Sequence, residues 1–462
     1  MFDVLDKSLE YGRSLGPEYI ELRAEDILLT TIQFDDGQVK NLNQRIEKGV
    51  AIRVLSNGAW GFVSTSDFEN LNQYIDRAVA LAKSAAASRR EPIKLAETKA
   101  ITDTVKLSVK ESPIDLSNEE KVEWMSQVYK QIKDYDERIG AVSLKLRDGW
   151  GKKYLVTSSG HKIEFDVGFV HHYAWVTGKE GASITAARDE VGSTSEGWEF
   201  LKKTQGAENI GKRVANRVKL QLEAVAAKGG SFPTVLAPHV IGVVAHEALG
   251  HLSEADLTVQ SSFGGKLGQK VANDFVNMTD DGTLPGGFGT SKYDDEGTPT
   301  SRVEIIKDGI LTELLTNREY AARMGLRPTG NARAQDYRFM PIIRMRNTFF
   351  EKGDWADDEL FEGIKFGYLC VDFRGGQAEL NASFQVGVQE AYEIVNGEVG
   401  RPVKDLSISG IATDTLFKIE GIGKGTFEFE QGRCGKGQEA FISAGGPMIR
   451  VSEGGITFGG KK

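Results

Sequence analysis

Apolar positions in the first part of the chain follow two periods, one typical of helices and one typical of strands. Residues 3–15 have helical spacing. Strand-like runs follow at residues 19–34, 39–42, 50–55 and 60–63. Asp36-Gly37 and Asn57-Gly58 lie between these runs and predict hairpin turns, because both pairs tolerate positive φ. The pattern predicts a helix followed by an antiparallel sheet.

Two Ser-x-x-Glu motifs predict the starts of further helices. In a capping box, the serine and the glutamate each accept the backbone N–H of the other residue. The motif at residues 66–69 would open a helix through Ala86, and the motif at residues 117–120 a helix to about Tyr135. Residues 88–112 are polar and irregular, which is typical of a linker.

Strand patterns return over residues 141–187, and a further helix is expected over about residues 206–227. Asp-Gly at residues 148–149 and Ser-Gly at residues 159–160 predict turns between these strands. Helix, antiparallel strands and helix therefore occur twice. This order indicates two related α+β units, although no sequence repeat is visible.

The composition changes in the last part of the chain. Residues 231–462 hold 34 of the 53 glycines and 8 of the 11 prolines, which predicts short strands and tight turns. Strand-like runs include residues 232–236, 411–419, 426–430 and 449–458. Between the first two of these runs, a helix from Pro238 through about Asp256 would be apolar nearly all round and therefore buried.

The expected fold is α+β, with two N-terminal units of helix and antiparallel sheet before a β-rich C-terminal domain that carries the buried helix. The expected domains are an N-terminal α+β domain at residues 1–90, a central α+β domain at residues 110–228 and the C-terminal domain at residues 229–462.

The buried helix carries His246, Glu247 and His251 in the order H-E-A-L-G-H. Zinc-protease helices space their histidines by four residues, which leaves them about 40° apart around an ideal helix. A spacing of five leaves them about 140° apart, so a regular helix could not aim both at one ion. A π-bulge would restore a shared face, and Gly250 would tolerate the distortion. The spacing therefore either excludes a shared ion or predicts an irregular helix.

Two interpretations of these polar residues compete. A single buried histidine is more often a hydrogen-bonded core residue than a metal ligand. Two histidines and a glutamate in an apolar helix would together cost several kcal/mol to bury unless something satisfied them. A bound metal ion would satisfy all three.

A catalytic zinc usually has three protein ligands and one open position. Cys434 is the best third candidate, because its turn carries Arg433 and Lys436, and neighbouring cations favour a thiolate. The alternative is a small turn residue. Cys370 lies in an apolar run and is expected to be a core thiol. Glu254 and Asp256 could be ligands, partners that orient a histidine, or exposed capping residues.

Charge and apolar content narrow the classes of function. The chain has 462 residues, a net charge of -9 and no apolar run near the ~20 residues of a membrane span. A sequence-independent nucleic-acid binder needs a basic surface, so neither DNA nor a membrane is an expected partner. The start of the chain is charged and lacks an apolar signal region, and the two cysteines make no disulfide framework. A cytoplasmic location is expected.

Several ordered segments resemble the TldD/PmbA family of metalloproteases over essentially the whole chain. They are residues 246–256, 264–269 (GGKLGQ), 294–299 (DDEGTP), 330–333 (GNAR) and 344–348 (RMRNT), and the glycine-rich turn around Cys434. The H-E-x-x-x-H motif is typical of the TldD side and is missing from the PmbA side, so the resemblance is to the catalytic type.

The resemblance implies one zinc ion per chain held by His246, His251 and Cys434, with Glu247 as the base that activates a metal-bound water. It also implies cleavage of unfolded or flexible peptides and a dimer, either with a PmbA-like partner subunit or with a second copy. One alternative is a non-catalytic peptide-binding or scaffold subunit, and the intact Glu247 argues against it. A nucleic-acid-associated regulator is disfavoured by the acidic charge.

Other polar residues have less defined expectations. Arg344, Arg346 and Tyr337 are candidates for stabilising an oxyanion, without a ranking among them. The remaining histidines, His161, His171, His172 and His239, are expected to be structural. His171 and His172 would alternate faces on a strand, so at most one of them is expected to point inward.

Overall fold

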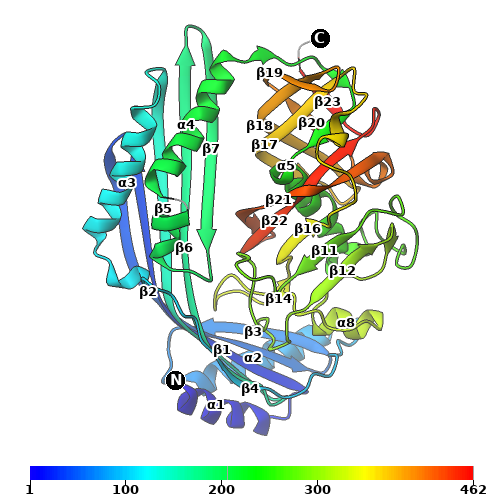
Figure 1. Ribbon diagram of the computed structural model, residues 1–462. Coiled ribbons are helices and arrows are strands. Elements are labelled where there is room, and N and C mark those ends of the chain that lie inside the picture. Colours follow the sequence, from blue (N-terminus) through cyan, green and yellow to red (C-terminus); the bar gives the residue numbers. More distant parts are fainter. Residues whose placement is uncertain (205, 461–462) are drawn as a thin grey trace.

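A mostly antiparallel sheet runs through the N-terminal half of the protein (Figure 1). The computed structural model describes residues 1–204 and 206–460, and in these residues the sheet has seven strands in the order β3-β2-β1-β5-β6-β4, with β7 beside β6. The strands are β1 Tyr19–Asp35, β2 Gln38–Ser56, β3 Ala59–Thr65, β4 Thr102–Val105, β5 Ile139–Thr157, β6 Lys162–Glu180 and β7 Ser183–Ser193. Because β1 pairs with β5 along fifteen residues of each strand, the two α+β units share one sheet.

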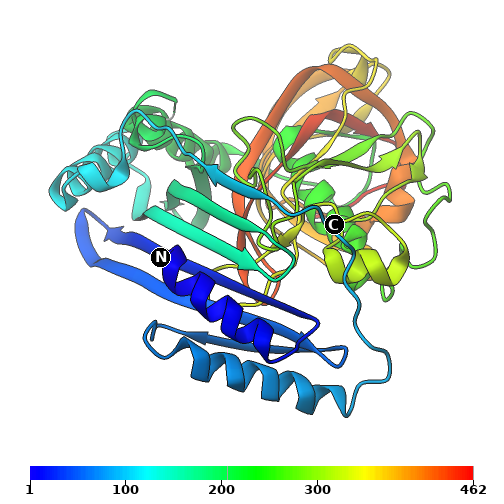
Figure 2. The ribbon, with the colours of Figure 1, turned by 90° about the horizontal axis from the view of Figure 1, so that it is seen from below.

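Four helices cover one face of this sheet. They are α1 Phe2–Ser14, α2 Leu71–Ala86, α3 Asn118–Lys133 and α4 Ala207–Glu223. The first two pack on β1 and β2, and α3 and α4 pack on β5 and β6, in two separate apolar clusters. Figure 2 shows α1 and α2 at the end of the molecule remote from the C-terminal domain.

Several local predictions are confirmed. Asp36 and Asn57 have φ of 47° and 52° at the tips of the β1–β2 and β2–β3 hairpins. The side chain of Ser117 accepts the N–H of Glu120, and Glu120 accepts the N–H of Ser117, as in a capping box.

Two other local predictions are wrong. The helix α2 begins at Leu71 without a capping box, because the Asp67 carboxylate, not Ser66, accepts the N–H of Glu69. The predicted turn at residues 148–149 lies inside β5, where Asp148 is buried against Lys121. The predicted linker at residues 88–112 is mostly irregular, and it contains one short strand, β4, which pairs in parallel with β6.

The C-terminal domain is built around a buried helix from strands that range from two residues in β8 to 17 residues in β21, so the strands are not uniformly short as predicted. Its main sheet has fourteen strands in the described residues: β8 Val225–Ala226, β9 Gly230–Ser231, β10 Thr234–Leu236, β11 Met278–Asp281, β12 Arg302–Lys307, β13 Ile310–Leu311, β16 Asn347–Phe350, β17 Phe366–Ala378, β18 Ser383–Val395, β19 Glu398–Lys404, β20 Ser407–Ile411, β21 Ile419–Gly435, β22 Glu439–Val451 and β23 Thr457–Gly459. A separate pair joins β14 Ala332–Arg333 to β15 Ile342–Ile343. The predicted strand over residues 411–419 is wrong, because α9 Ala412–Thr415 follows directly after β20.

The buried helix lies between β17 on one side and β21 and β22 on the other (Figure 1). It begins as α5 Pro238–Val243, with proline at the first helical position. A side chain at Gly242 would lie 2.7 Å from backbone atoms of Ala444, so the glycine lets the helix approach β22 closely. No helix within residues 1–204 and 206–460 is long and apolar enough to cross a membrane.

Both His171 and His172 are buried on β6, which contradicts the expectation that at most one points inward. His172 contacts Trp124 of α3, and His171 stacks on Phe288 of the C-terminal domain. Strand residues still alternate faces, but this sheet is covered on both faces. The sequence of one strand cannot show a cover that comes from a distant part of the chain.

Candidate metal centre

The helix that carries the two predicted metal-binding histidines is irregular, as their spacing predicts. The segment Val244–Gly250 (η3) is π-helical and is followed by α6 His251–Ser253. The N–H of His251 donates to the carbonyl of His246, five residues earlier. The extra residue in this turn brings the two imidazole ring centres to 5.1 Å from one another.

Gly250 is needed for close packing and not for an unusual backbone conformation. Its φ of −59° is ordinary for a helix, so the distortion does not require a glycine. A Cβ at this position, however, would lie 2.0 Å from the sulfur of Met345. The glycine therefore lets the irregular segment between β15 and β16 pack directly against the π-helical turn.

His246, His251 and Cys434 meet at one point, although they come from the helix and from β21. Each offers a ligand atom, and these atoms all lie within 4.8 Å of one another. The sulfur of Cys434 is 3.3 Å from Nε2 of His251. Both ring nitrogens of His246 are buried and have no hydrogen-bond partner in the described parts of the chain. One thiolate and two imidazoles are a donor set that suits zinc, so these residues fit such an ion.

Glu254 orients His251. Its carboxylate accepts a hydrogen bond from Nδ1 of His251 at 2.8 Å, which leaves Nε2 directed at Cys434. The Glu254 side chain is fully buried, and its other oxygen accepts the N–H of Met345. Of the roles left open for Glu254, the structure thus shows that of a partner holding a histidine, an arrangement common around protein metal sites.

The turn after Cys434 is fixed to the helix by Lys436. Its ammonium group bonds the carboxylates of Glu254 at 3.0 Å and Asp256 at 2.7 Å. Arg344 is buried and donates to the backbone carbonyls of Cys434 and Gln438. These contacts place the thiol and leave neither Arg344 nor Lys436 free to act on a substrate.

The two other suggested oxyanion stabilisers are also engaged elsewhere. Arg346 is buried and donates to the carbonyls of Gly330 and Gly289. The ring of Tyr337 lies over Gly49 of β2.

The two histidines, rather than the neighbouring cations, favour the thiolate. Burial opposes ionisation of Cys434, but His246 and His251 outweigh it and lower the pKa of the thiol to about 4. Burial likewise opposes protonation of His251, but Glu254 and Cys434 raise its pKa to about 10. Cys370 differs, because burial alone raises its pKa, as expected for a core thiol.

Glu247 stands beside this cluster and faces open space. It lines a cavity of about 270 Å³ together with His246 and residues of β17, β21 and β22. Its Oε2 lies 4.0 Å from Nε2 of His251, and 27% of its side chain is exposed. Glu247 therefore has the access to solvent and substrate that the fully buried Glu254 lacks.

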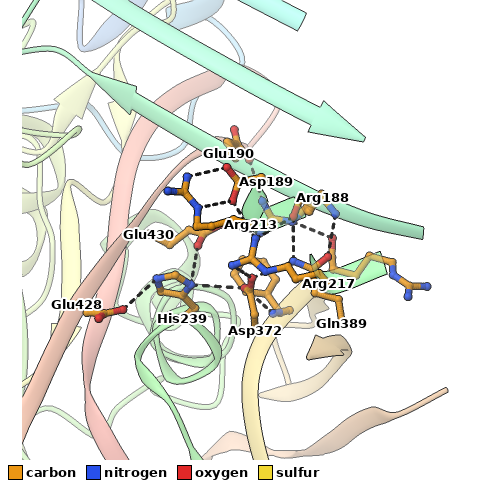
Figure 3. A network of polar contacts seen from close by, with 12 residues as sticks. Arg188, Asp189, Glu190, Arg213, Arg217, His239, Asp372, Gln389, Glu428 and Glu430 are labelled. Atoms are coloured by element: carbon orange, nitrogen blue, oxygen red, sulfur yellow. Dashed lines mark hydrogen bonds and ion pairs between the residues drawn. The ribbon is translucent and has the colours of Figure 1, made fainter. Parts of the chain in front are cut away.

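A second cluster of possible ligands lies on the same helix and was missed from the sequence. His239 of α5 meets Asp372 of β17 and Glu430 of β21, with ligand atoms within 4.8 Å of one another (Figure 3). Arg217 pairs with Asp372 at 2.6 Å, and Arg188 pairs with Glu430 at 2.9 Å. No local motif marks this cluster, because its members come from separate elements.

The fold and the family of the chain define a metallopeptidase. Sequence profiles of the PmbA/TldA metallopeptidase domain 1, central domain and C-terminal domain match residues 20–82, 111–222 and 229–458. A protein of Methanocaldococcus jannaschii named as a metalloprotease is 36% identical, over 97% of this chain and 98% of its own length. A zinc metalloprotease TldD homolog of Saccharolobus solfataricus is 34% identical, over 97% and 98%. The chain belongs to the PmbA/TldD family.

Solved structures share the fold at lower identity. TldE from Thermococcus kodakarensis has a TM-score of 0.73 and 18% identity, over 99% of this chain and 100% of that chain. A Thermotoga maritima protein described as a candidate modulator of a DNA gyrase has a TM-score of 0.78 and 21% identity over the same shares. At these identities the likeness supports the fold alone.

Proposed function

We propose that this protein is a zinc-dependent peptidase that cleaves unfolded or flexible peptides. In this proposal, His246, His251 and Cys434 hold one zinc ion per chain and Glu247 is the catalytic base. The observation that supports it is that the ligand atoms of these three side chains converge beside Glu247, which lines a cavity. In the described residues, the ring nitrogens of His246 have no hydrogen-bond partner that would compete with a metal ion.

The chain's own residues hold the metal ligands in position and transfer the proton. A zinc ion in such a site lowers the pKa of bound water and polarises the scissile carbonyl. Glu247 accepts the proton of the attacking water and passes it to the leaving amine. Glu254 keeps His251 in one orientation during this exchange, because it is buried and bonded to Nδ1. Lys436 and Arg344 keep Cys434 in place through the turn.

A non-catalytic peptide-binding or scaffold subunit is the second candidate. It needs a cavity, but it needs no acid or base beside the metal. The partly exposed side chain of Glu247 next to the histidine cluster favours the enzyme.

We also propose that the chain acts as a cytoplasmic dimer, with a PmbA-like partner or with a second copy. Residues 38–49 of β2 pair with β1, and within the described chain no strand pairs with their other edge. Val39, Leu42 and Ile46 are exposed on this segment. An unpaired strand with apolar side chains is a surface that another chain can cover. We also propose that the chain divides into three domains, at residues 1–90, 110–228 and 229–462.

The test combines metal content with peptide cleavage. Elemental analysis should find one zinc per chain, and an unfolded substrate such as casein should be cleaved, with cleavage lost on chelation and regained on adding zinc. Light scattering of the protein, alone and mixed with a PmbA-like partner, tests the dimer. Bound zinc without any cleavage, in either assembly, would favour the scaffold instead.

A further inference from the structure

Arg433 lies between two cavities, on the opposite face of β21 from Cys434. Successive residues of a strand point to opposite faces, so Cys434 points to the helix and Arg433 points to the N-terminal sheet. Arg433 lines the cavity that contains Glu247 and also a larger cavity of about 410 Å³ between the C-terminal domain and the sheet. A chain bound at the candidate metal centre would therefore pass close to this guanidinium.

The charges around Arg433 are not balanced. The carboxylate of Glu439, on the neighbouring strand β22, bonds Arg433 at 2.8 Å and pairs with Arg147 of β5 at 3.5 Å. Burial and the charges of both arginines lower the pKa of Lys145, which lies on the same strand β5. Three cations thus share one carboxylate, and Nε of Arg433 is buried without a hydrogen-bond partner in the described residues.

The single carboxylate of this group is also its most exposed member. Half of the Glu439 side chain is exposed, against 24% for Arg433 and 23% for Arg147. Its carboxylate can therefore turn into solvent while the two guanidinium groups stay in place. Burial, followed by the charge of Arg433, lowers the pKa of Arg147, which agrees with a shortage of negative charge.

Nearby acidic side chains of the smaller cavity have other partners. Glu190 bonds His171 and Arg188, and Glu430 pairs with Arg188 and His239. Their hydrogen-bonded partners thus lie outside the group on β5 and β21. Burial opposes ionisation of Glu190, but His171 and Arg188, and to a smaller degree the charge of Arg433, lower its pKa.

We infer that Arg433 and Arg147 bind a carboxylate of the peptide substrate, which takes the place of Glu439. The inference rests on the proposed peptidase function and adds a preference to it. Guanidinium groups suit this role because their planar donors match a carboxylate. Three phenylalanine rings lie next to this point. The ring centre of Phe441 is 4.4 Å from that of Phe288 and 4.9 Å from that of Phe169. They would contact the apolar part of the residue that bears the carboxylate.

The test measures binding, so that it does not depend on turnover. Zinc-loaded Glu247→Gln protein is titrated against three fluorescent hexapeptides of one sequence: a free C-terminal carboxylate, its amide, and an amide with one internal glutamate. We expect the first or the third to bind about tenfold or more tightly than the plain amide, and the tighter one identifies a terminal or a side-chain carboxylate.

Two added substitutions give opposite predictions. Arg433→Gln should bring the ratio of the dissociation constants close to one, whereas Glu439→Gln should increase it because the competing carboxylate is gone. Arg323→Gln, on an exposed arginine of the helix α8 Arg318–Met324, is the matched control and should leave the ratio unchanged.

Equal binding of all three peptides would overturn the inference. So would an equal loss of affinity for all peptides in both Arg433→Gln and Glu439→Gln, which would show a structural ion pair. The proposed function is judged separately by cleavage in the unsubstituted protein. A carboxylate preference without any cleavage would sustain the binding site and reject the peptidase.

Discussion

Two clusters of possible metal ligands share one helix and the strand β21 of this protein, and they differ in what surrounds them. The helix contributes His239 to one cluster, and His246 and His251 to the other, while β21 contributes Glu430 and Cys434. In both clusters the ligand atoms lie within 4.8 Å of one another. Distance therefore does not distinguish them.

The partners of the ligand atoms do distinguish the clusters. Asp372 and Glu430 are already paired with Arg217 and Arg188, and these arginines come from the α4 and β7 side of the molecule (Figure 3). Both ring nitrogens of His246 lack any hydrogen-bond partner in the described residues. We interpret the first cluster as a charged contact between domains and the second as the metal centre. A cation adds little where arginines already balance the charge, and it satisfies a buried imidazole nitrogen whose lone pair has no other partner.

The largest effect is expected from Glu247→Gln, which alters the metal-centre cluster alone. Glutamine keeps the shape of the side chain but cannot accept the proton, so peptide cleavage should fall by about 10²–10⁴. Zinc content and the thermal unfolding midpoint should stay close to those of the original protein. Full activity in this variant would require another base and would contradict the role given to Glu247.

Asp372→Asn should affect stability and leave zinc binding unchanged. The carboxylate is buried and paired with Arg217, and breaking a buried pair by removing one partner costs about 3–5 kcal/mol. Arg217 keeps Asp189, so the lower end of this range is expected in urea unfolding.

The matched control for Asp372→Asn is Glu208→Gln, in an exposed pair with Lys212 on α4. That substitution should leave the free energy of unfolding close to that of the original protein, because an exposed ion pair contributes little. Similar losses of unfolding free energy in the two variants would show that the cluster around His239 does not stabilise the fold.

Glu254→Gln should weaken zinc binding without removing it. Loss of the partner that orients a ligating histidine typically reduces metal affinity by about 10–100-fold. Competition with a chromophoric chelator measures this change. The same assay on Asp256→Asn, whose carboxylate reaches only Lys436 among these groups, should show a smaller change.

The stability of the protein should also depend on pH. Burial opposes protonation of His239, but Asp372 and Glu430 raise its pKa to about 9, above about 6.5 for the unfolded chain. Its contribution to stability is therefore complete below pH 6.5 and is lost as the pH rises toward 9. The contribution of His172 to stability has the opposite dependence on pH. Burial lowers the pKa of His172 to about 3, so its contribution is lost as the pH falls below 6.5. His239→Gln should flatten the stability profile between pH 6.5 and 9 and leave the acid side unchanged.

The sequence predicted what depends on local spacing. The five-residue interval between His246 and His251 predicted the π-helical turn, and the Asp-Gly and Asn-Gly pairs predicted the first hairpins. The sequence also singled out Cys434, but for the wrong reason, because the histidines and not the nearby cations favour its thiolate.

Features that depend on distant segments could not be predicted. The burial of His171 arises from Phe288, more than one hundred residues away along the chain. The shared sheet depends on the pairing of β1 with β5. The cluster of His239 with Asp372 and Glu430 depends on three elements and on two arginines from the other side of the molecule.

The most direct test of the central claim is the zinc content of three proteins after equal dialysis against a weak chelator. The account predicts one zinc per chain in the original protein, none in Cys434→Ser, and one in Glu430→Gln. Zinc retained in Cys434→Ser but lost in Glu430→Gln would place the metal in the cluster around His239 and contradict the account.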